Sequence, residues 1–480
     1  MNRHKWLTTA LVLAFSLALA DRASAKAPQN RPNILFVFAD DQCFETLHAL
    51  GHPLIETPNL DRLVQRGITF TEAYNQGSWS GAVCVASRTM LNTGRFLWRA
   101  DRVYNTAEQE RQAGRFWSEY MKAAGYDTYM TGKWHVKADP EKAFDYVTNV
   151  RGGMPNQTPE GYDRPIEGQP DPWSPWDTKF GGYWAGGKHW SEVLGDDAIS
   201  FLGQAARRDK PFFMYLAFNA PHDPRQSPKE YVDKYPLEKV DVPINFLPEY
   251  PFKDAIGCGK GLRDERLAPF PRTEYAVKVN RQEYYAIITH MDAQVGRILD
   301  ALEKSGKAEN TYIFFSADHG LAIGHHGLMG KQNLYDHSVR VPLIVCGPDV
   351  AQGKKLDAPV YLQDIMPSTL ELAGVEKPDH VQFKSLMPLV RGEAEKSYDA
   401  IYGAYLAVQR SVKQDGYKLL LYPKIAKARL FHVQEDPYEM KDLADDPQYK
   451  PLMKKLFARL LELQEETGDE LDLKGVFPEL

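Results

Sequence analysis

Three short apolar segments of this chain each end at acidic or histidine residues. They read ILFVFA (Ile34 to Ala39), which is followed by two Asp residues at 40 and 41, PFFMYLAFNAPHDP (Pro211 to Pro224) and TYIFFSADHG (Thr311 to Gly320). Continuous runs of this length, rich in β-branched and aromatic residues, are typical of strands buried on both faces of a parallel sheet. Since the carboxyl ends of parallel strands share one edge, we expect the polar ends to converge in one crevice.

Helical and further strand patterns follow these segments. Tyr284 to Glu303 has a helical pattern, Val341 to Pro348 reads as another strand, and Leu362 to Ala373 reads as a helix. This alternation predicts an α/β fold with a large mixed, mostly parallel sheet flanked by helices. The 480 residues are 43% hydrophobic and 25% charged. That composition excludes a fibrous repeat, wholesale disorder and a multi-span membrane protein.

The pattern changes after about residue 395. The segments YKLLLY and RLFHV are rich in β-formers, and a charged amphipathic helix is expected from about residue 448 to 466. We therefore divide the chain into a main domain, residues 26–395, and a smaller C-terminal α+β subdomain, residues 396–480. The subdomain is expected to hold a small antiparallel sheet and a helix.

Two long stretches lack any period, 150–187 and 241–272. The first contains Trp173, Trp176 and Trp184. Long loops in compact domains are mostly functional or disordered. Because three Trp residues favour order, we expect the first stretch to form a wall of the crevice.

The N-terminal segment reads as an export signal. Arg3 and Lys5 precede an apolar run from Trp6 to Ala20, and the sequence ASA that ends at Ala25 offers a cleavage pattern. The alternative is a membrane anchor, but a span needs roughly 20 apolar residues. We expect cleavage near Ala25, no stable membrane insertion, and a periplasmic or extracellular mature protein.

The charge balance argues against one class of partner. Residues 1–25 hold Arg3, Lys5 and Arg22 against Asp21, so their removal changes the formal net charge from −6 to −8. A mildly acidic chain is not typical of general nucleic-acid binders. We expect no nucleic-acid partner.

The segment around Cys84 carries a signature. It reads GAVCVASRTMLNTGR, from Gly81 to Arg95. The CVASR and TGR elements resemble the signature of the type I sulfatases, which are formylglycine-dependent members of the alkaline phosphatase-like superfamily. In that family Cys-x-(Pro/Ala)-Ser-Arg directs oxidation of the cysteine to formylglycine. Two positions depart from the commoner pattern, because Ala86 replaces Pro and Asn92 stands where Leu is usual.

Further sulfatase-like motifs follow in the order that the family requires. They are RPNILFVFADDQ (31–42), TGKWH (131–135), APHDP (220–224), and SADHG followed by GHHGLMGKQNLYDHSVRVPLIV (316–345). LFHVQEDPYEMKDLADDP, at 430–447, is similar to the family's C-terminal hairpin. The resemblance implies an alkaline phosphatase-like fold, a catalytic domain at 26–395 and a sulfuric ester hydrolase.

The same resemblance implies six catalytic residues, namely Cys84, Arg88, Lys133, His135, His222 and Lys331. Formylglycine at 84 would be hydrated to a gem-diol, of which one hydroxyl attacks sulfur while the other later loses its proton and expels sulfate. Arg88 and Lys133 would hold the diol, and His135 would be the base for the elimination. His222 would protonate the leaving alcohol, and Lys331 would contact the sulfate. Taken alone, each such His or Lys is more often structural or solvated.

The resemblance also implies a metal site formed by Asp40, Asp41, residue 84, Asp318 and His319. An oxygen-rich set favours Ca²⁺ over Zn²⁺. Elementary chemistry agrees, because a sulfate ester gains negative charge on oxygen as it breaks and calls for a cation and fixed donors. Two adjacent Asp residues after a strand are, by themselves, more often a helix N-cap. His319 either binds the ion or only orients the sulfate.

One segment suggests how a substrate would be bound. GGKHWSE, at 186–192, offers aromatic platforms and cations suited to a sulfated carbohydrate. Our candidate substrate contacts are Lys188, His189, Trp190 and Arg340. The alternative is that His189 and Trp190 pack against or cap a helix beginning near Ser191. A formylglycine-generating or sulfatase-maturating enzyme is the implied partner during biosynthesis.

Two other functions stay open. One is a phosphodiester or phosphonate monoester hydrolase that uses the same site, and matched sulfate and phosphate esters would separate it from a sulfatase. The other is an unmodified, inactive protein that binds sulfated glycans. A protein that only binds has no need for the two lysines and two histidines of the catalytic set.

The remaining cysteines are few. Without Cys84 the chain keeps Cys43, Cys258 and Cys346, an odd number. Cys43 closely follows the acidic pair, and Cys346 lies within a predicted buried strand, so we expect neither to be bridged.

Overall fold

A computed structural model describes residues 31–153 and 158–480 of the chain. The predicted export signal at residues 1–25 lies outside the described residues and stays a prediction. Among the helices that are described, none combines the length and the apolar character required to cross a bilayer.

The centre of the fold is an eight-stranded sheet in the order β12-β2-β11-β10-β1-β9-β5-β6. Strand β1 is parallel to β9 and β10, and β5 is parallel to β6 and β9, whereas β11 runs antiparallel to β10 and β2. The predicted large, mostly parallel sheet is therefore confirmed. The strands are β1 (Asn33–Asp40), β2 (Ile68–Phe70), β5 (Asp127–Lys133), β6 (Tyr146–Arg151), β9 (Phe212–Pro221), β10 (Thr311–Ala317), β11 (Leu343–Cys346) and β12 (Lys354–Leu356).

The three segments with polar ends form β1, β9 and β10, which are neighbours at the middle of the sheet. Every residue of β1 and β9 is buried, which explains their continuous apolar sequences. The register pairs Ala39 with Ala317 and Asp40 with Pro221. The three strands thus end at the same level, and their polar continuations share one edge.

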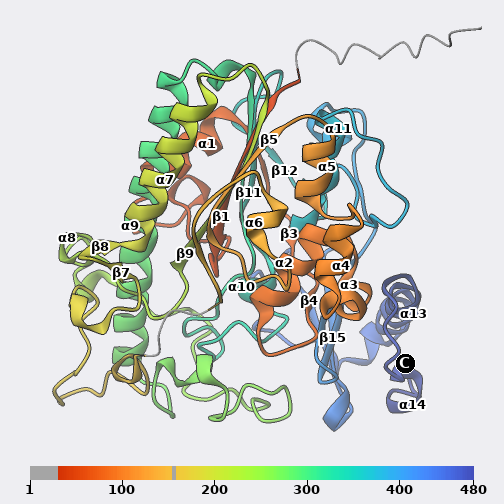
Figure 1. The fold of residues 1–480 in the computed structure, drawn as a ribbon. Helices are drawn as coiled ribbons and strands as arrows, with labels where there is room; N and C mark the ends of the chain where they lie inside the picture. Colours follow the sequence, from red (N-terminus) through yellow and green to blue (C-terminus); the bar gives the residue numbers. More distant parts are fainter. Residues whose placement is uncertain (1–30, 154–157) are drawn as a thin grey trace, which may run out of the picture. The chain divides into compact units, whose positions relative to one another are not determined.

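Helices cover both faces of the sheet (Figure 1). One side carries α1 (Pro58–Arg66), α7 (Trp190–Ala205) and α9 (Glu274–Lys304), and the other carries α2 (Val83–Thr93), α3 (Leu97–Tyr104), α4 (Ala107–Gln112), α5 (Trp117–Ala123), α6 (Pro140–Ala143) and α11 (Ile365–Leu372). Shorter elements are α8 (Lys229–Val232), α10 (Asp336–Val339), α12 (Met387–Val390) and the two-residue strands β3 (Ala73–Tyr74), β7 (Trp184–Ala185), β8 (Lys188–His189) and β13 (Val360–Tyr361).

Aromatic packing fixes α5 on the sheet. The Trp117 ring is fully buried, and its centroid lies 5.2 Å from that of Phe36 and 4.8 Å from that of Phe213. Its indole N–H donates to Thr369 Oγ1 at 2.7 Å, so the polar atom is also satisfied. Aromatic residues, which make up 12% of the chain, form part of the core here.

A second sheet has the order β17-β16-β15-β14-β4. Its members are β4 (Gly77–Ser78), β14 (Ile401–Tyr405), β15 (Gln409–Gln414), β16 (Tyr417–Tyr422) and β17 (Lys427–His432), followed along the chain by α13 (Lys450–Thr467) and α14 (Leu473–Val476). Strands β14 to β17 are antiparallel, whereas β4 adds to β14 in parallel. A segment of the N-terminal half therefore completes the C-terminal sheet, and the division at residue 395 stays a prediction.

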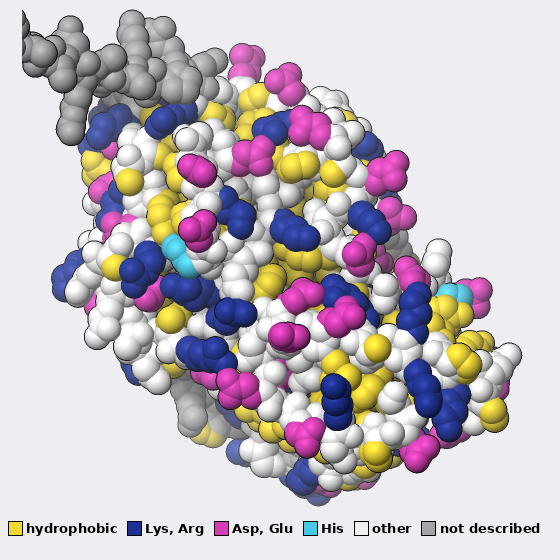
Figure 2. Space-filling model, turned by 90° about the vertical axis from the view of Figure 1, so that its right-hand side faces the viewer, with side chains coloured by type: hydrophobic (Ala, Val, Ile, Leu, Met, Phe, Trp, Pro, Cys, Tyr) yellow, Lys and Arg dark blue, Asp and Glu magenta, His cyan; other side chains and the backbone are white. Residues whose placement is uncertain are grey.

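The surface seen in Figure 2 carries basic and acidic side chains interspersed with one another. A mixed surface of this kind produces no extended field of one sign over that face. On that face, any attraction for an anionic substrate must therefore come from local groups.

The junction between β4 and β14 gives a stability prediction. Gly77 has φ +100°, and a Cβ added there would lie 1.9 Å from the Ala404 carbonyl oxygen. We expect Gly77→Ala to lower the free energy of unfolding by about 1–3 kcal/mol or more, because both the backbone conformation and the strand contact are disturbed. The measurement is the midpoint of chemical denaturation.

Gly203→Ala is the matched control, because Gly203 lies in α7 and an added Cβ would meet nothing within 4 Å. This change should leave the midpoint unchanged or raise it, by up to about 1 kcal/mol. Equal effects of the two substitutions would contradict the role given to Gly77.

Candidate active site

The polar ends of the central strands meet the buried helix α2. Asp40 ends β1, Lys133 ends β5, and Asp318 directly follows β10. Helix α2 brings Cys84 and Arg88, which are four residues apart and therefore lie on one face of the helix. His222, after β9, and Lys331, in the loop after β10, complete the group. All of these side chains are buried.

Three buried carboxylates each pair with one buried cation. Lys133 forms an ion pair with Asp40, Lys331 Nζ lies 2.5 Å from Asp41 Oδ2, and Arg88 Nε donates to Asp318 Oδ2 at 2.8 Å. An uncompensated buried charge is costly, so these pairs hold the charged groups of the cluster inside the protein. Arg88 also donates through Nη1 to the Lys133 carbonyl oxygen at 2.7 Å.

The Cys84 sulfur lies in the middle of this cluster. Its Sγ is 3.3 Å from Asp40 Oδ1, 3.7 Å from Asp41 Oδ1 and 3.4 Å from Lys331 Nζ. Burial, reinforced by the charges of Asp318 and Asp40, raises the pKa of the Cys84 thiol well above its ordinary value. Because the thiolate is the reactive form of cysteine, the unmodified thiol is a poor nucleophile here.

His222 connects Lys331 to a neighbouring carboxylate. Its Nδ1 donates to the Asp223 carbonyl oxygen at 2.7 Å and lies 3.0 Å from Asp223 Oδ1. The other ring nitrogen, Nε2, is 2.9 Å from Lys331 Nζ. Since Nδ1 carries the proton in this tautomer, Nε2 accepts from the Lys331 ammonium.

His135 is held in a left-handed backbone conformation, with φ 54°. Its Nδ1 is buried and has no hydrogen-bond partner among the described residues. Burial, together with the charges of Lys133 and Arg88, lowers the pKa of His135 to about 2. The imidazole is thus neutral at ordinary pH. A pKa this low makes it a weak proton acceptor in this state, so the role of His135 as a base stays a prediction.

The cluster offers a divalent cation two carboxylates, one sulfur and one imidazole nitrogen. Ligand atoms of Asp40, Asp41, Cys84 and His222 all lie within 4.8 Å of one another. Carboxylate oxygens of this kind suit Ca²⁺ or Mg²⁺. In addition, Arg88 Nη2 is buried 3.8 Å from Asp40 Oδ1 and has no hydrogen-bond partner among the described residues. Its N–H groups can therefore donate to an oxygen of a bound molecule.

Two predicted metal ligands lie outside this group of four. Asp318 Oδ1 accepts from the Asp41 backbone N–H at 3.1 Å, and its other oxygen binds Arg88. His319 Nδ1 lies 3.2 Å from the Gly320 carbonyl oxygen, and burial lowers the pKa of His319 to about 4. The structure brings His222 into the group, while metal binding by Asp318 and His319 stays a prediction.

The candidate substrate contacts on β8 and α7 are not in the Cys84 cluster. His189 caps α7, because its Nδ1 accepts from the Ser191 N–H at 3.0 Å and its Nε2 donates to the Gln226 carbonyl oxygen at 2.7 Å. Lys188 is exposed and lies 2.5 Å from Asp196. The Trp190 ring stacks on the Arg151 guanidinium at 3.3 Å. These contacts match the alternative given above for His189, in which it caps the helix.

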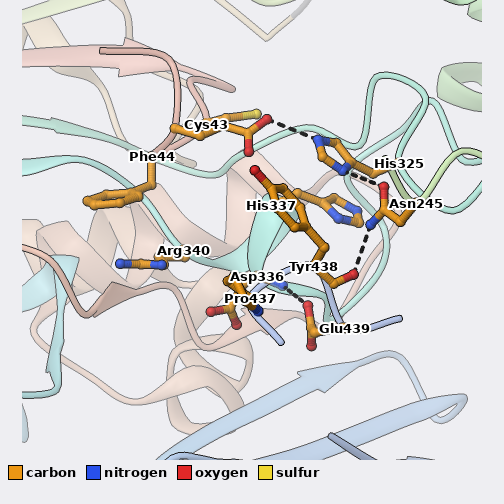
Figure 3. A pocket seen from close by; sticks show the side chains of 11 residues that line it. Cys43, Phe44, Asn245, His325, Asp336, His337, Arg340, Pro437, Tyr438 and Glu439 are labelled. Carbon is orange, nitrogen blue, oxygen red and sulfur yellow. Dashed lines mark hydrogen bonds and ion pairs between the residues drawn. The ribbon is translucent and has the colours of Figure 1, made fainter. Parts of the chain in front are cut away.

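Arg340 lies in a separate cavity of about 170 Å³ (Figure 3). Its guanidinium stacks on Phe44 at 3.9 Å, and its Nε donates to the Thr71 carbonyl oxygen at 2.6 Å. His325 and Tyr438 also line this cavity. Among the described residues that line it, none belongs to the six predicted catalytic residues. The structure therefore does not bring Arg340 together with Cys84.

Sequence reasoning missed several charged neighbours of the cluster. Asp264 is buried, with its Oδ2 3.9 Å from Lys331 Nζ, and Arg263 Nη2 lies 3.5 Å from Asp223 Oδ1. Both residues come from the irregular stretch 241–272, where no period or motif distinguishes one charged residue from another. The one available signal was the length of the loop itself.

The sequence matches the family model described as Sulfatase over residues 32–375. A second family model, described as N-sulphoglucosamine sulphohydrolase, C-terminal, matches residues 324–466. These two matches together span both sheets.

Individual proteins resemble the chain along most of its length. The arylsulfatase of Clostridium perfringens is 30% identical over 492 residues, covering 93% of this chain and 98% of that protein. The N-acetylglucosamine-6-O-sulfatase of Bacteroides thetaiotaomicron is 26% identical and covers 95% and 91%. The solved structure of BT4656 in complex with its substrate D-glucosamine-2-N,6-O-disulfate has a TM-score of 0.70 at 24% identity, covering 92% of this chain and all of that one.

The pairing of Arg88 with Asp318 gives a second stability prediction. In chelator-treated protein, Arg88→Met should lower the free energy of unfolding by about 3–5 kcal/mol, because Asp318 would stay buried without a counter-ion. Denaturant titration of the two proteins measures the difference.

Arg62→Met is the control, since Arg62 pairs with Asp300 at 3.1 Å on the surface. Exposed ion pairs contribute about 0–1 kcal/mol, so this variant should differ little from the parent protein. If Arg88→Met were as stable as Arg62→Met, the buried pair would not be holding the cluster together.

Proposed function

Because this chain belongs to the sulfatase family and is a sulfuric ester hydrolase, we propose that it hydrolyses sulfate esters of a carbohydrate after export, using a formylglycine made from Cys84 and a bound Ca²⁺. The observation that carries the proposal is the position of Cys84. Its sulfur lies between Asp40 Oδ1, at 3.3 Å, and Lys331 Nζ, at 3.4 Å, inside a CVASR motif.

The surroundings of Cys84 support a modified residue rather than a thiol. A formylglycine at this position would supply a hydrated aldehyde as the nucleophile. The thiol, by contrast, is kept protonated by burial and by the nearby carboxylates. Arg88 and Lys133, which anchor Asp318 and Asp40, would hold the modified side chain and favour its ionised form.

The cations of the cluster suit an anionic ester. Lys331 contacts Asp41, Cys84 and His222. Its ammonium is therefore close enough to residue 84 to donate to the oxygens of a sulfate bound there. His222 would take a proton at Nε2 from this network and pass it to the leaving alcohol. His135, whose Nδ1 has no hydrogen-bond partner among the described residues, would act as the base that prepares release of sulfate. This role requires its pKa to rise when the bound anion offsets the charges of Lys133 and Arg88.

Asp40 and Asp41 would hold the metal ion with residue 84. When bound, Ca²⁺ would offset negative charge on the sulfate oxygens. The carboxylates of Asp40 and Asp41 support calcium, and oxidation of Cys84 to formylglycine would replace the sulfur of the group of four by oxygen.

The names of relatives support a carbohydrate substrate and do not identify it. N-acetylglucosamine-6-O-sulfatase acts on a sulfated sugar, and BT4656 binds another. The apolar run and ASA pattern near Ala25 support export to the periplasm or beyond.

Modification of Cys84 is directly measurable. In protein purified from its native host, mass spectrometry of the peptide containing residue 84 should find an aldehyde. Cys84→Ala should fold like the parent protein but reduce turnover of an aryl sulfate to background, because the nucleophile is gone.

Cys346→Ala serves as the control, since Cys346 is a buried free thiol at the end of β11, where its Sγ lies 3.3 Å from the Leu63 carbonyl oxygen. It should retain turnover. A quantitatively alkylatable thiol at position 84 in the native protein, or full activity of Cys84→Ala, would disprove the formylglycine assignment.

Calcium binding predicts a measurable stabilisation. In Cys84→Ala protein freed of metal by a chelator, Ca²⁺ at about 100 times its Kd should stabilise the fold by about 2.7 kcal/mol. Calorimetric titration gives the Kd, and thermal denaturation gives the shift. Asp41→Asn should raise the Kd for Ca²⁺ and reduce the thermal shift, because it removes a charged ligand.

Asp300→Asn, at a surface ion pair, is the control and should bind Ca²⁺ like the parent protein. Tighter binding of Zn²⁺ than of Ca²⁺ would contradict the assignment of the metal, and so would an unaltered Ca²⁺ affinity in Asp41→Asn.

A further inference from the structure

The edge strand β6 ends beside the catalytic cluster. In the register of β5 and β6, Arg151 is the partner of Lys133, and both are the last residues of their strands. Neighbouring strands lie about 4.8 Å apart. Arg151 is therefore one strand away from the lysine that pairs with Asp40.

Two further contacts fix this segment against the site. The Trp134 N–H donates to the Arg151 carbonyl oxygen at 3.0 Å. Gly153 packs so closely on the His135 ring that an added Cβ would lie 2.2 Å from Nε2. The end of β6 thus lies beside the segment that carries both Lys133 and His135.

The Arg151 guanidinium is held in place but is only partly hydrogen-bonded. Its Nη1 donates to Asn219 Oδ1 at 2.9 Å, and its plane stacks on Trp190 at 3.3 Å. Its Nε and Nη2 are shielded from water and have no hydrogen-bond partner among the described residues. Burial lowers the pKa of Arg151 to about 9, so the group is still charged at neutral pH.

The two unpartnered N–H donors of Arg151 are the pair with which guanidinium groups generally bind oxyanions. The N–H groups of Nε and Nη2 form one edge of a guanidinium, and that edge matches two oxygens of a carboxylate, a sulfate or a phosphate. Two other buried arginines use this edge in the same way: Arg164 for Asp171 and Arg410 for Asp469. In Arg151 the same edge has no carboxylate partner among the described residues.

We propose that Arg151 is a specificity-determining residue, which binds a second anionic substituent on the sugar whose sulfate ester is hydrolysed. Trp190 and Asn219 orient the guanidinium, and the substituent is a carboxylate or another sulfate. The inference rests on the proposed carbohydrate substrate. It adds that the preferred sugar carries two negative groups, one for the Cys84 cluster and one for Arg151.

The test is calorimetric binding in a Cys84→Ala background with Ca²⁺ present, so that no turnover occurs. Two matched pairs separate the sources of the anion. N-sulfoglucosamine 6-sulfate is compared with N-acetylglucosamine 6-sulfate, and a 2-O-sulfated hexuronate is compared with its methyl ester. We expect the anionic member of at least one pair to bind more tightly, and the pair that shows the preference identifies the substituent.

Arg151→Gln should reduce that preference about tenfold or more, because a charge-assisted bidentate contact is lost. Arg151→Lys, which keeps the charge without the fork, should retain only part of it. Arg208→Gln is the control: Arg208 is exposed and stacks on Tyr146 at the opposite end of β6, so the preference should be unchanged.

Three results would overturn the inference. The first is equal binding of both members of each pair to the parent protein, and the second is an unchanged preference in Arg151→Gln. In either case the carbohydrate proposal survives, because sulfated sugars still bind. The third is the absence of binding by any of the four sugars, which would overturn the carbohydrate proposal as well.

Discussion

The structure depends on the compensation of buried charge at one edge of the central sheet. Asp40, Asp41 and Asp318 are withdrawn from water because three apolar strands end at the same level. Lys133, Lys331 and Arg88 neutralise them one for one. Removing any one of these six groups would leave its partner buried and charged, which is far more costly than the loss of a surface ion pair. The charged groups at this edge are therefore stable inside the protein only as pairs.

This requirement explains where the other elements of the site come from. Helix α2 is buried along its whole length, so it can carry Arg88 to Asp318 without exposing the pair to water. The loop after β10 must return to the sheet edge because Lys331 is the counter-ion of Asp41. The irregular stretch 241–272 adds Asp264 on the far side of Lys331. Arg88, Lys133 and Lys331, three of the residues proposed to be catalytic, are thus also the structural counter-ions of the cluster.

The sequence predicted the parts of this arrangement that have a local signal. Strands β1, β9 and β10 were evident because burial on both faces forces a continuous apolar run, and YKLLLY coincides with β16. The motif around Cys84 indicated the family, and the family indicated the cluster. No local signal marked Arg263, Asp264 or Arg151, since their role depends on which charges lie opposite them in space. His189 caps α7, which agrees with the alternative given for it, and its role as a substrate contact stays a prediction.

Charge arithmetic links the cluster to its ligand. Asp40, Asp41 and Asp318 balance Lys133, Lys331 and Arg88, while the neighbouring Asp223, Asp264 and Arg263 add a net −1, so a bound divalent cation would give the site a net charge of about +1 before substrate arrives. The single negative charge of a sulfate ester would offset that excess. A second anion on the sugar would compete for that same excess unless a separate cation received it. Arg151 is suited to this task because, unlike Arg88, it has no carboxylate partner among the described residues. A cluster with one excess positive charge for the reacting group, and an arginine without a carboxylate partner beside it, would allow one site to bind a dianionic sugar in a single orientation.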